Sequence, residues 1–186
     1  KKGPARTQNA SFGVSGSVIK EKSSFSLNFG GVNRYSTPNL YAAVPAGVIA
    51  RNVDIRQPTE GFNYSGLFDY AVTRDQTIRL SVNGSKTTSA NQGVGAYDLP
   101  GRGFSTDNRF FLVRFQEAGP IGRRAFINTR LLINWSESVS RSNLQERTIT
   151  VLDSFTSGGS QRAGGRHTTG FSLQSDLDYV RGRHSW

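Results

Sequence analysis

The stretch from Asn108 to Trp135 constrains the fold more than any other part of the sequence, because apolar residues recur at alternate positions over most of both of its halves. In the first half Phe111, Val113 and Phe115 alternate with a row that includes Arg114 and Gln116, and after a Gly-Pro turn the pattern returns up to Trp135. A period of two residues is that of a β-strand with different surroundings on its two faces. The stretch therefore predicts a β-hairpin with one apolar and one polar face.

The same alternation recurs along the chain and predicts an all-β protein. Tight turns at Lys20–Ser23 and Thr73–Gln76 join two further pairs of alternating segments, and one more alternating segment follows near the C-terminal end. We expect antiparallel, up-and-down strands. The predicted strands are residues 10–19, 24–32, 61–73, 76–85, 108–118, 124–136 and 169–180.

Three long connections separate these hairpins, at about residues 33–59, 86–107 and 137–168, and only Thr148–Leu152 stands out in them as a candidate short strand. Loops longer than about 12–15 residues are uncommon in compact domains. A strict rhythm of short turn and long loop is typical of outer-membrane barrels, which have short turns on one rim and long external loops on the other. The pattern therefore predicts about seven strands of a large transmembrane β-barrel.

The two faces of the predicted strands differ in composition. The apolar face ends in aromatic residues and fits contact with lipid. We expect these residues to face lipid: Phe68, Tyr70, Leu80, Val82, Phe111, Val113, Phe115, Leu131, Ile133, Trp135, Leu173, Leu177 and Tyr179. The polar face is rich in Ser and Asn and fits a water-filled or plugged lumen. We expect these residues to face the lumen: Arg79, Asn128, Arg130, Gln174, Asp176 and Asp178.

Composition removes several function classes. The 186 residues include no Cys, which excludes disulfides, thiolate metal sites and a Cys nucleophile. The formal net charge is +10, but the basic residues are scattered, so we expect no nucleic-acid partner. The sequence contains no run of about 18 apolar residues, so we expect no membrane-spanning helix. The Lys1–Pro4 start is followed by no apolar signal segment, so we expect a protein that is not exported or an internal part of a longer chain.

Catalytic and metal-binding patterns are weak. His167 lies in a Gly-rich region and His184 in a predicted turn at the opposite rim, which argues against a metal pair or a His-centred triad. Asp176 and Asp178 share a strand face and are candidates for a cation site or an acid/base pair. The alternative, that they are lumen carboxylates balanced by arginines, is favoured. We expect no enzyme activity, no metal and no cofactor.

Three short motifs resemble the barrel of TonB-dependent outer-membrane receptors, most closely the Oar-like type. They are the Gly119-Pro120-Ile121 turn, the Phe68-Asp69-Tyr70 segment and the stretch from Leu177 to Trp186. The resemblance implies a barrel of about 22 strands around an N-terminal plug in the outer membrane of a Gram-negative bacterium. It also implies transport of a ligand too large or scarce for porins, driven by the TonB complex. Neither plug nor N-terminal regulatory-like domain is visible, and the resemblance transfers no ligand-binding residue.

Two other functions stay open. In a soluble or surface-anchored all-β adhesin, the same apolar rows would face one another across the core of a sandwich. An enzyme is the third hypothesis, because the sequence lacks a recognisable catalytic site.

An odd number of strands also predicts two open sheet edges and an uncovered apolar face, so this stretch alone is expected to aggregate.

Overall fold

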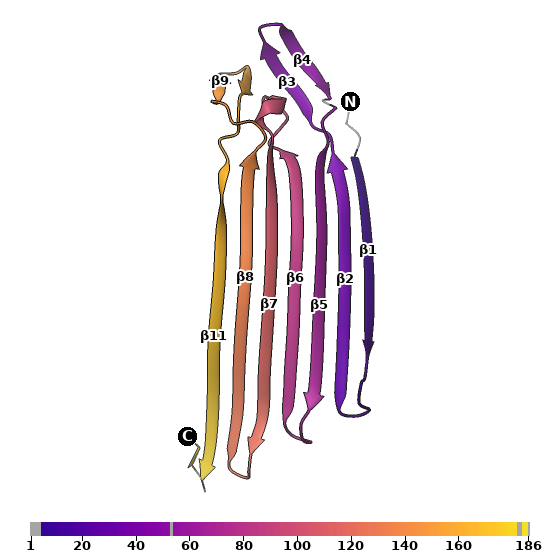
Figure 1. Cartoon of the computed structure of the whole chain (residues 1–186), viewed down its shortest axis with the longest axis vertical. Coiled ribbons are helices and arrows are strands. Elements are labelled where there is room, and N and C mark those ends of the chain that lie inside the picture. Colours follow the sequence, from indigo (N-terminus) through magenta and orange to yellow (C-terminus); the bar gives the residue numbers. More distant parts are fainter. Residues whose placement is uncertain (1–4, 53, 182–183, 186) are drawn as a thin grey trace.

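Long antiparallel strands form one extended sheet in the computed structural model, which describes residues 5–52, 54–181 and 184–185 (Figure 1). The sheet order is β1-β2-β5-β6-β7-β8-β11-β12. Seven of these strands have 12 to 19 residues, and β12 has 2. The long strands are β1 (Ala5–Gly16), β2 (Ser23–Ser36), β5 (Gln57–Ala71), β6 (Thr77–Gln92), β7 (Phe104–Ile121), β8 (Ala125–Ser142) and β11 (Ala163–Arg181), and the short one is β12 (His184–Ser185).

The predicted all-β, antiparallel, up-and-down architecture is confirmed. Each long strand pairs with the strand that precedes or follows it among the long strands, as in Figure 1. The order is linear, with β1 at one edge and β12 at the other, so the described residues form an open sheet. No second layer of the described chain covers either face of it.

The strands extend further toward the loops than the alternation predicted. β6 continues to Gln92, and β8 continues to Ser142, where the residues are mainly Ser, Thr and Asn. These segments lack the apolar signal of a strand, but each continues a hydrogen-bonded ladder that its neighbour has begun. Strand length was therefore underestimated wherever both faces are polar.

The first strand ends earlier than predicted, at Gly16 instead of residue 19. Ile19 enters a turn, because its amide donates to the Ser23 hydroxyl at 2.8 Å and its carbonyl accepts from the Ser23 amide at 3.0 Å. Glu21 has a φ of 62° in this turn. The side-chain and backbone hydrogen bonds of Ser23 thus close the turn. As a result β1 ends three residues before its predicted end.

The sequence suggested that the long connections are mostly irregular. In the structure they contain regular elements. Residues 33–59 contain the hairpin of β3 (Asn39–Val44) and β4 (Gly47–Asn52), and the third connection contains β9 (Ile149–Val151) and β10 (Phe155–Ser157). β9 falls within the candidate strand at 148–152. The second connection carries the short 3₁₀-helix η1 (Pro100–Arg102). The β3–β4 hairpin was missed because residues 40–44 form an uninterrupted apolar run without the alternation that marks a strand.

Few apolar side chains are buried. Among the described residues only Leu40, Ala42 and Val94 form a buried hydrophobic group, with 2%, 0% and 6% of their surface exposed, and all belong to the loops. No helix in the described ranges is long and apolar enough to cross a membrane. The start at Lys1–Pro4 and the C-terminal residues 182–183 and 186, which were expected to form part of a turn and a next strand, lie outside the described residues.

Candidate functional site: two faces of the sheet and a layer of loops

The register of the sheet brings the residues predicted to face lipid onto one face. Phe68, Leu80, Phe115, Leu131 and Leu173 pair with one another in sequence across five strands. The remaining ones are separated from this row by even numbers of residues and lie on the same side. We call this side the apolar face. Its residues include Tyr70, Val82, Phe111, Val113, Ile133, Trp135, Leu177 and Tyr179.

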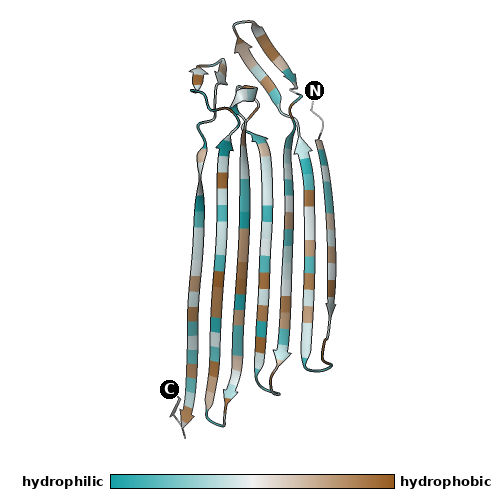
Figure 2. Ribbon diagram, viewed as in Figure 1, coloured by the Kyte–Doolittle hydropathy of each residue, from teal (hydrophilic) through white to brown (hydrophobic). Residues whose placement is uncertain are grey.

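The apolar face is open to its surroundings. Phe171, Leu173 and Leu177 on β11 keep 69%, 62% and 60% of their surface exposed, and Phe12 on β1 keeps 65%. In Figure 2 the hydrophobic positions gather in the part of the strands toward the short turns, whereas the part toward the loops is more polar. A monomeric soluble protein rarely leaves so continuous an apolar patch uncovered.

An aromatic row bounds the apolar face on the loop side. One cross-strand row runs through β1, β2, β5, β6, β7 and β8, and five of its six positions are aromatic. Its members are Phe12, Phe29, Tyr64, Gly84, Phe111 and Trp135. At its centre the Tyr64 ring lies over Gly84, which has no side chain to obstruct it. The sequence predicted aromatic residues at the ends of the apolar face but did not reveal that five of them share one row.

Charged residues replace aromatic ones two positions further toward the loops. Lys86, Arg109, Glu137 and His167 pair with one another in turn across β6, β7, β8 and β11. Arg109 Nη1 lies 3.8 Å from Glu137 Oε2, and the His167 ring meets the Trp135 ring edge-on at 5.5 Å between centroids. The change from apolar to aromatic to charged thus takes place within a few residues along the strand.

The residues predicted to face the lumen lie on the opposite side, which we call the polar face. Arg79 pairs through Gln116 with Arg130 and then Gln174 in one row. Asp176 pairs with Asn128, and Asp178 pairs with Phe126 near the turn rim. Arg79 Nε donates to Asp69 Oδ1 at 2.6 Å, and Gln116 Nε2 donates to Asn128 Oδ1 at 3.2 Å. The face is otherwise dominated by Ser, Thr and Asn.

The loops form a connected layer at the far end of the sheet. The segment Gly95–Leu99 lies between β3 and β10 and bonds to both. Tyr41 N donates to Ala96 O at 2.7 Å, and Leu99 N donates to Thr156 O at 2.9 Å. Parallel bridges join Leu40 to Ala96 and Asp98 to Thr156. Three connections that are distant in sequence therefore share one hydrogen-bonded layer, which the sequence did not predict.

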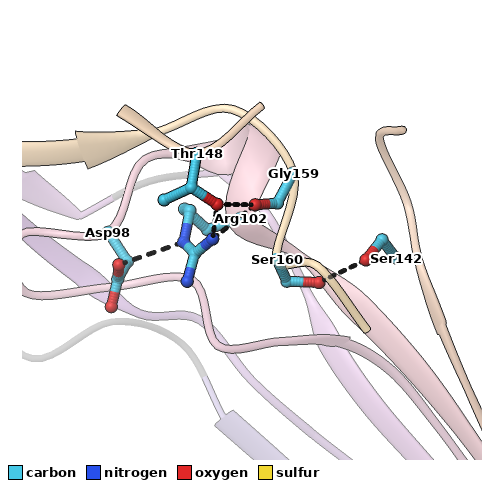
Figure 3. Close-up of polar contacts among 6 residues, drawn as sticks. All are labelled: Asp98, Arg102, Ser142, Thr148, Gly159 and Ser160. Atoms are coloured by element: carbon cyan, nitrogen blue, oxygen red, sulfur yellow. Dashed lines mark hydrogen bonds and ion pairs between the residues drawn. The ribbon is translucent and has the colours of Figure 1, made fainter. Parts of the chain in front are cut away.

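Arg102 links the second and third connections, as Figure 3 shows. Its Nη1 donates to Thr148 Oγ1 at 3.0 Å and to the Gly159 carbonyl, while its Nε lies 3.5 Å from Asp98 Oδ1. Nearby, the Ser142 and Ser160 hydroxyls are 2.7 Å apart (Figure 3). A planar guanidinium with several donors suits this role, because one side chain satisfies acceptors from separate segments.

The histidines and aspartates that the sequence offered as weak candidates for catalysis or metal binding do not form a common site. His167 is in the charged row, whereas the backbone of His184 pairs with Arg181 at the turn end of β11. Among the described residues, no group of three or more His, Cys, Asp or Glu could hold a metal ion. Asp176 and Asp178 are on one face but have no further acidic neighbour within this arrangement.

The geometry defines the chain as an open, single-layer antiparallel sheet with one apolar face, one polar face and a layer of loops. Comparison with protein-family models, curated proteins and solved structures finds no match to this chain.

Proposed function

We propose that the chain forms part of the wall of an outer-membrane β-barrel of the TonB-dependent receptor kind. The apolar face contacts lipid, the polar face lines the lumen, and the loop layer faces the exterior and takes part in capturing a ligand too large or scarce for porins. The observation that carries the proposal is the exposed apolar face, which ends in one continuous aromatic row. The remainder of the barrel, a plug and the TonB complex are its expected partners, and the expected location is the outer membrane of a Gram-negative bacterium.

The height of the apolar face supports contact with a bilayer. On β8 it extends from Ala125 to Trp135, with Thr129 as its polar interruption. At about 3.3 Å per residue these residues cover about 33 Å along the strand. A strand tilted by about 40° then spans about 25 Å across the membrane, which is the height of the apolar band of outer-membrane barrels.

The stagger of the short turns is a second support. Measured from the row that contains Phe25, Phe68, Phe115 and Leu173, the turn-side strand ends are two residues away at Ser23, three at Ala71, six at Ile121 and eight at Arg181. The turns step in one direction across the sheet in Figure 1. Closure of a sheet into a barrel requires tilted strands with this kind of stagger.

The loop layer presents residues that suit ligand capture. Tyr41 and Tyr97 are 54% and 55% exposed, and each follows one partner of the Leu40–Ala96 bridge. Two accessible phenol rings on neighbouring segments offer flat apolar surface together with hydroxyl groups. The hydrogen bonds around them hold the segments in place, which lowers the entropy cost of binding.

Adjacent leucines on β8 provide a direct test of the orientation. Leu131 lies on the apolar face and Leu132 on the polar face, and the chain has no Cys, so single Leu131→Cys and Leu132→Cys variants each carry one labelling site. A polarity-sensitive fluorophore would be attached at each position in the full-length protein inserted into lipid vesicles. We expect a brominated lipid to quench the label at position 131 and to leave the label at position 132 largely unquenched.

The same pair distinguishes the alternatives. Equal quenching at both positions, or stronger quenching at position 132, would refute the lipid-facing assignment. A monodisperse protein in plain buffer, with the label at 131 shielded from aqueous quenchers, would instead indicate a second protein layer, as in the adhesin sandwich.

A further inference from the structure

Three arginines gather at the middle of the polar face. Arg79 on β6 and Arg130 on β8 occupy the same row, each opposite Gln116 of β7. Arg114, two residues before Gln116 on β7, is opposite Ser81 on one side and Leu132 on the other. Arg114 is therefore diagonal to both other arginines, at a spacing that long side chains bridge across a sheet.

The three guanidinium groups are unequally neutralised. Arg79 is bound by Asp69 through two contacts, at 2.6 and 3.3 Å. Among the described residues the side chains of Arg114 and Arg130 make neither a hydrogen bond nor an ion pair. Asp176 is diagonal to Arg130 on β11 but forms no such ion pair with it. Arg114 thus has two cationic diagonal neighbours and no acidic one.

We propose that Arg79, Arg114 and Arg130 form a binding site for a small oxyanion, a solute with one or two carboxylate or phosphate groups. Like charges directly opposite each other on adjacent strands are destabilising, and diagonal positions remain within reach of long side chains. An anion bound between the arginines would offset their mutual repulsion. Guanidinium groups bind carboxylate and phosphate oxygens through paired hydrogen bonds. The Ser81 hydroxyl, directly opposite Arg114, supplies a further donor.

The surroundings favour a small solute over an acidic polypeptide. The other arginines of this face, Arg34 on β2 and Arg166 on β11, lie much nearer the loops. Asp176 and Asp178 lie between the site and the turn rim and would repel a segment with several carboxylates. In the middle of the face the positive charge is therefore limited to these three arginines. The site belongs to the polar face alone, so it does not depend on what covers the apolar face.

Calorimetric titration of the full-length protein in non-ionic detergent, with sodium phosphate and with succinate at low ionic strength and near-neutral pH, tests this site. We expect saturable binding of at least one of the two anions. Arg114→Gln should weaken it about tenfold or more, the effect of one lost charged hydrogen bond. Arg34→Gln removes the same charge from the same face at a distance and should change the affinity less than about twofold.

Two results would overturn the proposal: absence of saturable binding by the unsubstituted protein, or equal weakening by Arg114→Gln and Arg34→Gln. Preferential binding of an oligoglutamate peptide would overturn the assignment to a small solute. Thermal unfolding without added anion is the control for folding. We expect Arg114→Gln to leave the unfolding temperature unchanged or slightly higher, because the Arg114 side chain makes no hydrogen bond or ion pair among the described residues and its charge is repelled by the neighbouring arginines. Loss of anion binding with intact lipid quenching at position 131 would reject the anion site while leaving the barrel proposal standing.

Discussion

Gly84 lies where the aromatic row crosses β6, and the Tyr64 ring occupies the space that a side chain would need there. A Cβ at Gly84 would overlap the Cζ, Cε1 and Oη atoms of Tyr64. Glycine in a strand usually weakens it, but here its lack of a side chain lets a large ring lie flat across two strands. Gly84 therefore stabilises the aromatic row by leaving space for the Tyr64 ring.

Gly84→Ala is expected to destabilise the sheet by about 1–3 kcal/mol, because Tyr64 must leave its position or the strands must move apart. Chemical denaturation of the detergent-solubilised protein, followed by Tyr and Trp fluorescence, measures this change.

Gly31→Ala is the matched control for Gly84→Ala. Gly31 lies on the same face, and the nearest atom to an added Cβ is the Gly61 carbonyl oxygen at 3.7 Å, an ordinary contact. This substitution should be neutral or slightly stabilising, since alanine loses less backbone entropy than glycine. Equal destabilisation by the two variants would show that the Tyr64–Gly84 packing is not responsible.

At the scale of elements, the loop layer is held mainly by hydrogen bonds. Gln57 Nε2 on β5 donates to the carbonyls of Asn91 and Val94, and Asn143 Nδ2 donates to Asn91 Oδ1 at 2.8 Å. Together with the Arg102 bonds, these contacts tie the ends of β5, β6 and β8 to the loops. A layer held in this way is expected to open locally without unfolding the strands.

Arg102→Ala should loosen the third connection, because the Thr148 hydroxyl and the Gly159 carbonyl lose a shared charged donor. We expect amide hydrogen exchange around residues 155–159 to accelerate about tenfold or more, with little change in β7 and β8. Arg147→Ala is the control, since the Arg147 side chain makes no hydrogen bond or ion pair among the described residues. Similar acceleration in both variants would mean that Arg102 does not hold the layer together.

At the scale of the whole molecule, the sheet has two open edges and almost no buried apolar core. The β1 edge has an unpaired backbone, and every residue of β1 is exposed. Such edges and faces promote association with other chains. We therefore expect the structure to be stable as a separate body only when lipid, or further protein, covers the apolar face.

The 186-residue chain is accordingly expected to associate in plain buffer and to become monodisperse in a mild detergent, as measured by sedimentation velocity. Leu173→Lys, which places a charge on the apolar face, should reduce this association. Ser172→Lys, which places it on the polar face, should have a smaller effect. A monomer with a cooperative unfolding transition in plain buffer would contradict the expectation.

The sequence by itself determined the strands and their two faces wherever apolar and polar residues alternate. Leu131 and Leu132 show that position in the strand, and not residue type, decides the face, because these two identical neighbours lie on opposite faces. The alternation is readable since successive side chains of a strand point to opposite sides. The polar ends of β6 and β8 and the early end of β1 could not be read this way, because pairing and turn hydrogen bonds decide them.

Which residues of different strands lie opposite one another became known from the folded sheet alone. The row from Phe12 to Trp135, the arginines around Arg114 and the Gly95–Leu99 segment between β3 and β10 each depend on register between segments far apart in the chain. Register is set by the summed pairing of whole strands and by turn geometry, and no single segment encodes it. The faces of the sheet are thus local properties of the sequence, whereas its sites are properties of the assembled ladder.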